Sequence, residues 1–351
     1  MTLIKSISGI RGTIGGKPGE SLSPIDAVKF GCAYGTWIKN NSNDSNISVV
    51  IGRDARISGE MIQNLVQNSL VSLGINVIDL GLSTTPTVEL MVKKYNANGG
   101  IVITASHNPS NWNALKLLDK NGEFLNNKSG QEIIKISESN SYLFSEIIDL
   151  GKISKKKDSM SIHINSILNL DIVNTDLIKK SRLKVVVDGV NSTGGIIVPM
   201  LLNELNINFK TIYCDPSGDF NHNPEPLKKN LKDLCKKVLD EKADLGIAVD
   251  PDVDRLVFIC ENGEVFGEEN TLVACADYVL SKNPGPTVSN LSSTRALNDI
   301  TKSYNQSYYS CAVGEVNVVA KMKSKHAVIG GEGNGGVIYP KSHYGRDAIV
   351  G

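Results

Sequence analysis

The amino-acid sequence predicts a chain of consecutive α/β domains with mixed sheets, and three observations support this fold class. Short apolar runs of strand length alternate with helical patterns along the chain, which is typical of α/β folds. The length of 351 residues is enough for two or three domains of ordinary size. A Lys- and Ser-rich stretch at residues 151–169 separates the first alternating region from the next. We therefore expect one α/β domain before this stretch and two α/β units after it.

Composition excludes several classes of protein. Lys+Arg and Asp+Glu number 37 each, so the chain has no net basic field for nucleic acid or an anionic membrane. No apolar run approaches the roughly 20 residues of a membrane helix, and the N-terminus lacks the apolar core of a signal peptide. The six cysteines include no CxxC pair, which favours reduced and mostly buried thiols. We expect a cytoplasmic protein without nucleic-acid or membrane partners.

Turn and cap residues predict the order of elements in the first domain. Residues 4–12 predict a strand entering a Gly-flanked turn that presents Arg11, whose guanidinium suits a phosphate, although a plain surface turn fits equally well. Ser23 and Pro24 predict a helix start, with Ser at the N-cap and Pro at the first helical position. After this helix, which runs to about residue 39, we expect strands at 49–54 and 77–80, helices at 59–73 and 85–95, and a strand from residue 100.

The most informative stretch is residues 100–116. An apolar β-branched segment breaks there into small and polar residues, and an Asn-Pro pair forbids a longer strand. This turn would present Ser106 as a candidate nucleophile, beside His107, which titrates near neutral pH, and Lys116, which suits phosphate or proton transfer. The same residues also make a good turn without any function, because Ser and Asn bond their own backbone. This run alone leaves both interpretations open.

The rest of the chain predicts two more alternating units. We expect a short helix within 151–169, strands at 183–189, 209–213 and 244–249, helices at 195–205 and 231–241, and a long loop at 215–226. An Asn-Gly pair predicts a hairpin of strands 256–260 and 264–266. Helices at 269–280 and 294–302, a strand at 287–291, and a loop at 313–317 before a helix to about 323 follow. Glu315, in that last loop, is a candidate substrate-binding residue.

Three aspartates at a spacing of two follow the apolar strand at 244–249. Burying Asp250, Asp252 and Asp254 together is costly through repulsion and desolvation, and a divalent cation removes this cost. An all-oxygen ligand set indicates Mg²⁺ rather than zinc, and Arg255 would then lie beside a metal-bound phosphate. The alternative is an exposed acidic loop, which seldom follows an uninterrupted apolar strand. We favour the metal site.

Two other families with paired aspartates fit less well. A haloacid-dehalogenase-type phosphatase would need Thr or Val after its Asp-x-Asp, where this chain has Asp254-Arg255. A nucleotide-sugar transferase normally carries a pair of aspartates rather than a triplet. Neither family explains Ser106.

A Gly-rich loop at residues 330–336 carries Glu332 and Asn334. It formally matches G-x-G-x-x-G, but a strand follows it instead of the helix that a dinucleotide site requires. A carboxylate that accepts and an amide that both donates and accepts suit the hydroxyls of a sugar. A tight hairpin that needs Gly for its dihedral angles explains the loop equally well.

Together these motifs resemble those of the α-D-phosphohexomutase family. The residues 104–109 with Lys116, the aspartate loop with Arg255, and the Gly-rich loop occur in the order and spacing of that family, along the whole chain. The resemblance implies related α/β domains with mixed sheets around a central cleft. We expect domain I at 1–152 with the serine loop, domain II at 153–256 with the metal loop, and domain III at 257–351 with the sugar loop.

The resemblance also implies the chemistry and the site residues. Ser106 would be the phosphoserine that donates and recovers a phosphoryl group, and one Mg²⁺ would lie between its phosphate and the three aspartates. Arg11 and Lys116 match positions near the phosphoserine, with Lys116 as general acid or base, and His107 is a second candidate for that proton. Arg255, Glu332, Asn334 and Glu315 are the expected substrate-binding residues. The reaction implied is the interconversion of hexose 6-phosphate and hexose 1-phosphate through a hexose 1,6-bisphosphate.

Within the family, the opening residues and the Gly-rich loop look most like archaeal-like phosphoglucosamine mutases, with phosphomannomutase/phosphoglucomutase as the alternative. Two departures bear on this choice. Many relatives carry Ser-Gly-His where this chain has Asn334-Gly335-Gly336, and Ala114 replaces a common Gly. A sugar-phosphate-binding relative without turnover is the other functional class, and a purely structural role has no support. We expect a phosphosugar as the partner, and a monomer or homodimer.

The family continues into a fourth domain with a loop that grips the substrate phosphate. This sequence stops at residues 344–351, before that domain. We therefore expect a truncated chain without domain IV that can be phosphorylated at Ser106 but is a poor mutase.

Overall fold

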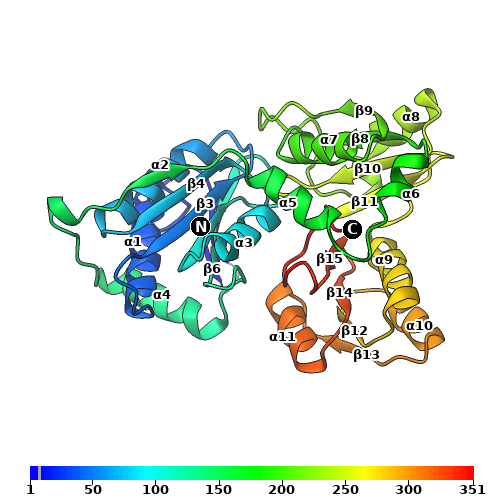
Figure 1. Ribbon diagram of the computed structural model, residues 1–351. Coiled ribbons are helices and arrows are strands. Elements are labelled where there is room, and N and C mark those ends of the chain that lie inside the picture. The colour runs from blue at the N-terminus through cyan, green and yellow to red at the C-terminus, as the bar shows by residue number, and fades with distance from the viewer. Residues whose placement is uncertain (7–8) are drawn as a thin grey trace. The chain divides into compact units, whose positions relative to one another are not determined.

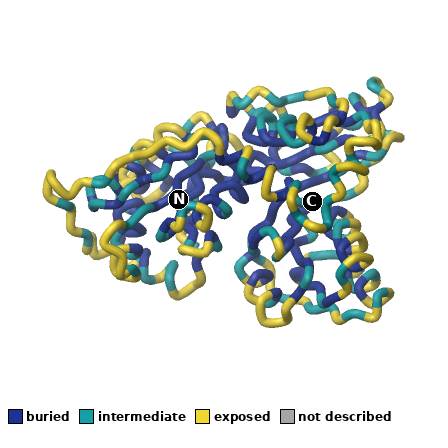
Figure 2. Tube along the Cα trace, in the orientation of Figure 1, coloured by how far each residue is buried: buried dark blue, intermediate teal, exposed yellow. Residues whose placement is uncertain are grey.

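The computed structural model describes residues 1–6 and 9–351, which divide into two compact units, Met1–Ser159 and Met160–Gly351. The first unit holds a sheet of seven strands, and the second holds two sheets of four strands each (Figure 1). Figure 2 shows the strands of these sheets mostly buried, with the exposed residues on the helices and loops around them. The predicted class of consecutive α/β domains with mixed sheets is confirmed.

The first unit is built on one mixed sheet with the strand order β1-β2-β6-β5-β3-β4-β7. Its elements are β1 (Ile4–Ser6), β2 (Gly9–Thr13), α1 (Pro24–Asn40), β3 (Ser48–Arg53), α2 (Gly59–Ser72), β4 (Asn76–Leu82), α3 (Thr85–Lys94), β5 (Gly99–Ile103), β6 (Trp112–Leu118), α4 (Asn127–Ser139), η1 (Ile147–Asp149) and β7 (Ile153–Lys155). Strands β3, β4, β5 and β7 run parallel, while β1, β2 and β6 pair antiparallel with their neighbours.

Helices cover both faces of this sheet because its strand residues alternate in direction. Val49 and Ile51 of β3 belong to the core formed with α1 and α2. On the opposite face, a Cβ at Gly52 would lie 2.6 Å from Val88 of α3, so the glycine lets this helix approach closely. The predicted start of α1 is confirmed, since Ser23 caps the helix and forms a capping box with Asp26.

One prediction for the N-terminal stretch is wrong. Arg11 lies inside strand β2, opposite Ile4 of β1 and Ala114 of β6, and not on a flexible turn. Strand β1 pairs antiparallel with β2, and residues 7–8 between them lie outside the described part of the chain. The pairing with β6 extends the strand through Arg11 in spite of its flanking glycines.

The second unit contains two sheets with the orders β11-β10-β8-β9 and β13-β12-β14-β15. Its elements are α5 (Ser159–Leu168), α6 (Thr175–Lys180), β8 (Lys184–Asp188), α7 (Gly194–Glu204), β9 (Asn208–Ile212), η2 (Lys228–Asn230), α8 (Lys232–Glu241), β10 (Leu245–Val249), β11 (Leu256–Cys260), α9 (Glu268–Lys282), β12 (Thr287–Asn290), α10 (Ala296–Ser303), β13 (Tyr308–Cys311), α11 (Glu315–Lys325), β14 (Ile329–Glu332) and β15 (Gly336–Ile338). In each sheet three strands run parallel and the last strand pairs antiparallel at the edge.

The same four-strand arrangement occurs in all three sheets. Each has the order fourth-third-first-second along the chain, as in β6-β5-β3-β4, β11-β10-β8-β9 and β15-β14-β12-β13. In each, the third strand is parallel to the first, and the fourth returns antiparallel beside it. The three units are therefore related in topology.

Two edge strands lie close to the predicted domain ends. Strand β7 pairs with β4 of the first sheet and begins just after residue 152, the predicted end of domain I. Strand β11 pairs with β10 of the second sheet and runs past residue 256, the predicted end of domain II. The domain ranges stay a prediction.

Two smaller expectations can also be compared with the structure. Cys32 is buried, but the other five cysteines are only partly buried, so the expectation of mostly buried thiols is wrong. Over the described residues, no helix combines the length and the apolar character that a membrane span needs.

Candidate functional site

The serine loop connects β5 to its antiparallel neighbour β6. Ser106 is 7% exposed and adopts φ 47°, a left-handed conformation that is uncommon for a residue other than Gly. Its backbone N–H donates to the hydroxyl of Thr104 at 2.9 Å, and that hydroxyl donates to Asp54 Oδ2 at 2.6 Å. A buried chain of hydrogen bonds thus holds Ser106 in an unfavourable backbone conformation.

Arg56 fixes the same loop, and the sequence analysis did not identify it. This arginine is 1% exposed, and its Nε donates to Asp54 Oδ2 at 3.0 Å. Its two terminal nitrogens donate to four carbonyl oxygens of the loop, those of Ser106 (2.5 Å), Asn108 (2.6 Å), Pro109 (2.6 Å) and Trp112 (3.0 Å). One guanidinium therefore sets the path of the backbone on both sides of the serine.

His107, Lys116 and Arg11 lie around this loop. The Nδ1 atom of His107 is 3.5 Å from Ser106 Oγ, at the limit of a hydrogen bond. Arg11 pairs with Ala114 across β2 and β6, and Lys116 is two residues further along β6. Since side chains two residues apart on a strand share a face, Arg11 and Lys116 lie on the same face of the sheet. Arg11 Nε is buried and makes no hydrogen bond to any described residue.

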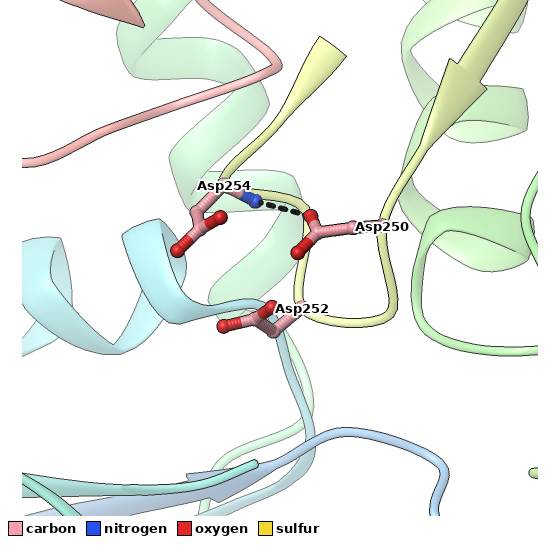
Figure 3. A group of neighbouring side chains, drawn as sticks. All are labelled: Asp250, Asp252 and Asp254. Carbon is pink, nitrogen blue, oxygen red and sulfur yellow. Dashed lines mark hydrogen bonds between the residues drawn. The ribbon is translucent and has the colours of Figure 1, made fainter. Parts of the chain in front are cut away.

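The aspartate loop connects β10 to β11 in the second unit. Asp250, Asp252 and Asp254 are fully buried, and each offers an oxygen within 4.8 Å of the others. Figure 3 shows the three carboxylates pointing toward a common space, with Asp250 bound to the backbone N–H of Asp254. Asp250 Oδ1 accepts hydrogen bonds from the N–H groups of Asp254 and Arg255, each at 3.1 Å. The loop turns tightly, with Val253 at φ 62°.

This cluster fits a divalent cation. Burial raises the pKa of Asp250 well above its usual value, and the charges of Asp254 and Asp252 raise it further, while Arg255 opposes them. A cation bound by the three carboxylates would remove the repulsion that causes this shift. Because every donor is an oxygen, the site suits a hard cation. The residues could therefore hold a metal ion.

Arg255 and Asn334 line a small hollow beside the aspartate loop. Its volume is about 160 Å³. Its walls are formed by Glu225, Pro226, Leu227, Arg255, Glu268, Ser292, Gly333 and Asn334. Arg255 Nη1 lies 3.4 Å from Glu225 Oε1, so the guanidinium is partly neutralised at the edge of the hollow. The hollow offers cationic, carboxylate and amide groups to a polar ligand.

The Gly-rich loop is a hairpin between β14 and β15, as the alternative interpretation of the sequence expected. Leu256 of β11 donates its N–H to the carbonyl of Gly335, which joins this loop to the end of the aspartate loop. Glu332 is buried, and its Oε1 accepts from Asn290 Nδ2 at 2.7 Å and from the N–H of Gly314 at 3.1 Å. The hairpin geometry and the placement of polar side chains are thus both present.

Arg346 is the second arginine that the sequence analysis missed. It is 8% exposed, and its guanidinium contacts the carboxylates of Asp254, Glu315 and Glu332. Glu315 begins helix α11 rather than lying in a loop, and both of its oxygens accept from Arg346 at 3.0 Å. Burial raises the pKa of Glu315, and the charge of Arg346 opposes this shift.

The structure thus gathers the predicted residues in two groups, each described within its own unit. Ser106, His107, Lys116 and Arg11 belong to the first unit. The three aspartates, Arg255, Glu315, Glu332 and Asn334 belong to the second. No pattern in the sequence marks Arg56 or Arg346 as buried. For Arg56, the available signal was its place two residues after Asp54, which ends the predicted strand at 49–54.

Comparison with known proteins identifies all three units. The sequence profile of phosphoglucomutase/phosphomannomutase alpha/beta/alpha domain I matches residues 3–143, that of domain II matches 161–263, and that of domain III matches 268–351. A phosphoglucomutase/phosphomannomutase of Thermococcus kodakarensis is 37% identical over 97% of this chain and 74% of its own length. A probable phosphoglucosamine mutase of Pyrococcus abyssi is 34% identical over 97% of this chain and 72% of its own.

Solved structures agree with these sequence matches. A phosphoglucomutase/phosphomannomutase family protein of Burkholderia thailandensis superimposes with a TM-score of 0.85 and 25% identity, over 99% of this chain and 75% of that one. A putative phosphomannomutase of Thermus thermophilus shares the fold with a TM-score of 0.88 at 23% identity, over 100% of this chain and 78% of that one. The chain therefore belongs to the phosphoglucomutase/phosphomannomutase family of phosphohexomutases, as the serine, aspartate and glycine motifs predicted.

Proposed function

We propose that the chain interconverts hexose 6-phosphate and hexose 1-phosphate through a phosphoserine at Ser106 and a bisphosphorylated sugar. The observation that carries this proposal is the serine loop. A buried network of Thr104, Asp54 and Arg56 holds Ser106 in a left-handed conformation within a domain of the mutase family. Such local strain is typical of functional sites, where the surrounding structure compensates for it.

Each half of the proposed reaction moves one phosphoryl group. In the first transfer, the bond between phosphorus and Ser106 Oγ breaks as a hydroxyl oxygen of the sugar bonds to phosphorus. The hydroxyl gives its proton to a base, and Ser106 Oγ takes up a proton. In the second transfer, Ser106 Oγ gives up its proton and bonds to the phosphorus of the other phosphate, while the bond between that phosphorus and the sugar oxygen breaks and this oxygen takes up a proton. Lys116 and His107 are the proposed proton carriers, and His107 Nδ1 lies 3.5 Å from Ser106 Oγ.

Charge stabilisation is the main remaining requirement of phosphoryl transfer. We assign the metal site to Asp250, Asp252 and Asp254, with Ser106 as the further ligand that the family resemblance implies, and we propose Mg²⁺ as the ion. A bound Mg²⁺ would neutralise charge that develops on the transferred phosphoryl group. Arg11, whose buried Nε bonds no described residue, is assigned to the phosphate near Ser106.

The sugar is assigned to residues of the second unit. Arg255 and Asn334 line the hollow beside the aspartates, and Glu332 and Glu315 lie behind it in contact with Arg346. Fixed amide and carboxylate groups are suited to the hydroxyls of a sugar. A similar fold, N-acetylphosphoglucosamine mutase of Aspergillus fumigatus, was solved in complex with GlcNAc-6P and magnesium, at a TM-score of 0.51 and 12% identity.

Glucosamine phosphate is the substrate that we propose first, in the direction from glucosamine 6-phosphate to glucosamine 1-phosphate. Support comes from relatives named as probable phosphoglucosamine mutases in Pyrococcus abyssi and Methanopyrus kandleri, at 34% and 31% identity. A specific observation favours the second candidate, phosphomannomutase/phosphoglucomutase. The Thermococcus kodakarensis relative with that name shares 37% identity with this chain.

Turnover assays on the three sugar phosphates decide between these candidates. Glucosamine 6-phosphate, mannose 6-phosphate and glucose 6-phosphate are offered separately with Mg²⁺ and a catalytic amount of the matching bisphosphate. We expect the largest kcat/KM for glucosamine 6-phosphate, and no turnover by Ser106→Ala. A preference for mannose or glucose phosphate supports the second candidate. Tight binding of a sugar phosphate without turnover of any of them would indicate a binding protein instead.

A further inference from the structure

We propose that Arg346 is a positioning residue that links the metal loop to the sugar loop, so that the charge of Glu332 affects the affinity for the divalent cation. This inference rests on the proposed metal site. Arg346 Nη2 donates to Asp254 Oδ2 at 2.6 Å, Nη1 donates to Glu332 Oε2 at 2.8 Å, and Nε donates to Glu315 Oε2 at 3.0 Å. A single buried guanidinium thus bridges the aspartate loop, the Gly-rich loop and the start of α11.

The charge balance around Arg346 makes its interaction with Asp254 depend on its other two carboxylate partners. Arg346 brings one positive charge to three carboxylates that are each at most 9% exposed. In a buried environment charges are weakly screened, so the guanidinium shares its charge among its partners. Asp254 is also a proposed metal ligand. The cation and Arg346 therefore interact with the same carboxylate.

The backbone around Arg346 is anchored to both loops. The N–H of Asp347 donates to the carbonyl of Val337 in β15 at 2.9 Å, and the N–H of Ala348 donates to the carbonyl of Val253 in the aspartate loop at 3.1 Å. The carboxylate of Asp347 lies 2.9 Å from His163 Nε2 and 3.3 Å from His343 Nε2. These contacts hold the backbone of residues 346–348 in place, so it should not shift when Arg346 loses one of its carboxylate partners.

The Gly-rich hairpin leaves room for the guanidinium arm. A Cβ at Gly336 would lie 2.4 Å from Cδ and 3.1 Å from Cγ of Arg346. Arg346 is absent from the walls of the hollow that Arg255 and Asn334 line. We therefore assign its effect on a bound cation to its contacts with Asp254 and Glu332.

Removing the charge of Glu332 should weaken metal binding. With one carboxylate neutral, more of the positive charge of Arg346 acts on Asp254, where it opposes a cation. Substitution of a residue that bonds a metal ligand commonly changes metal affinity by about 10- to 100-fold. The carboxylate of Glu332 is linked to Asp254 through Arg346, so for Glu332→Gln we expect a smaller fall in Mn²⁺ affinity, about fivefold, in the absence of any sugar.

The test is a titration of the whole chain with Mn²⁺, followed by electron paramagnetic resonance of the unbound ion. Glu264→Gln is the matched control, since Glu264 is an exposed glutamate of the same unit whose carboxylate accepts a hydrogen bond from Asn262 Nδ2 at 3.2 Å. We expect Glu332→Gln to bind more weakly and Glu264→Gln to bind like the parent chain. In the Arg346→Lys background, Glu332→Gln should have no further effect, because an ammonium cannot span the same carboxylates.

Three outcomes separate this inference from the proposed function. Unchanged Mn²⁺ affinity in Glu332→Gln, or the same loss in the Arg346→Lys background, overturns the role of Arg346 alone. Where Arg346→Lys does not fold, Glu315→Gln takes its place, and the inference then requires a loss of affinity in the same direction. No Mn²⁺ binding by the folded parent chain removes the proposed metal site and this inference with it.

Discussion

Ser106 owes its position to buried residues that are distant in the sequence. Its loop carries no regular structure, yet Arg56 binds four of its carbonyl oxygens from a position fifty residues earlier in the chain. Asp54 then binds both Arg56 and Thr104, which holds the serine N–H. The nucleophile is positioned by this network, and small changes in it should affect phosphoryl transfer more than folding.

Arg56→Lys tests this network. Lysine keeps the charge but cannot donate to four carbonyls from a planar fork, so the loop should lose its fixed path. We expect the rate of Ser106 phosphorylation by glucose 1,6-bisphosphate to fall by at least about tenfold. Arg53→Lys is the control, since Arg53 is more exposed, its Nη1 donates to the carbonyl of Asp54 at 3.2 Å and its Nη2 lies 3.9 Å from Glu60 Oε2. Equal rates for Arg56→Lys and the parent chain would contradict the positioning role.

Asp250 should make the stability of the metal-free chain depend on pH. Burial, with Asp254 and Asp252 next, raises its folded-state pKa above the usual 3.8. A raised pKa means that the folded state holds the proton more tightly than the unfolded state does. The protonated carboxyl group therefore stabilises the fold below the unfolded-state pKa, and this contribution to the free energy of unfolding is lost as pH rises through the folded-state pKa. In EDTA, the unfolding temperature should therefore decrease above about pH 4.

Asp250→Asn isolates this effect. Asparagine is neutral throughout the range, so the variant should lose this part of the pH dependence and unfold at a higher temperature than the parent at pH 8 in EDTA. Mg²⁺ should stabilise the parent chain and have little effect on the variant. Thermal unfolding followed by circular dichroism measures both. If the unfolding temperatures of parent and variant depend on pH in the same way, Asp250 is not the cause of this pH dependence.

The three candidate loops occupy equivalent positions, each within its own α/β unit. Each joins the third strand of its unit to the antiparallel fourth strand, as β5 to β6, β10 to β11, and β14 to β15. Strands β5 and β10 were expected from their apolar runs, whereas β14 was expected as part of the Gly-rich loop. Strand β6 was missed because it follows a turn directly and places Lys116 within an apolar segment, and β13 was missed because it is four residues long.

Gly336 of the Gly-rich hairpin packs closely against the side chain of Arg346. In Gly336→Ala the new methyl group would overlap the arm of Arg346, and overpacking of this kind typically costs about 1–3 kcal/mol. We expect a lower unfolding temperature and weaker Mn²⁺ binding. In Gly31→Ala of helix α1, the new Cβ would meet Ser69 and Val66 at 3.5 Å, an ordinary contact. Gly31→Ala should keep the unfolding temperature and the Mn²⁺ affinity of the parent chain. If both variants lost stability and affinity to a similar extent, the close contact between Gly336 and Arg346 would not be the cause.

For the whole molecule, the sequence was sufficient to predict the fold class and the family, but not the buried arginines that hold the site loops in place. Alternating strands and helices predicted the α/β units, and the spacing of the aspartates predicted their meeting in one buried cluster. Local patterns cannot show that Arg56 and Arg346 are buried, because their partners come from distant segments. The same limit applies to β7 and β11, whose partner strands come from separate segments of the chain.

The central claim is that Ser106 is the residue that carries the phosphoryl group. The most direct test is the intact mass of the chain, with peptide mapping, after incubation with glucose 1,6-bisphosphate and Mg²⁺. We predict a single added phosphate on Ser106 and none in Ser106→Ala. A folded, metal-binding chain that gains no phosphate, or gains it at another residue, would contradict the claim.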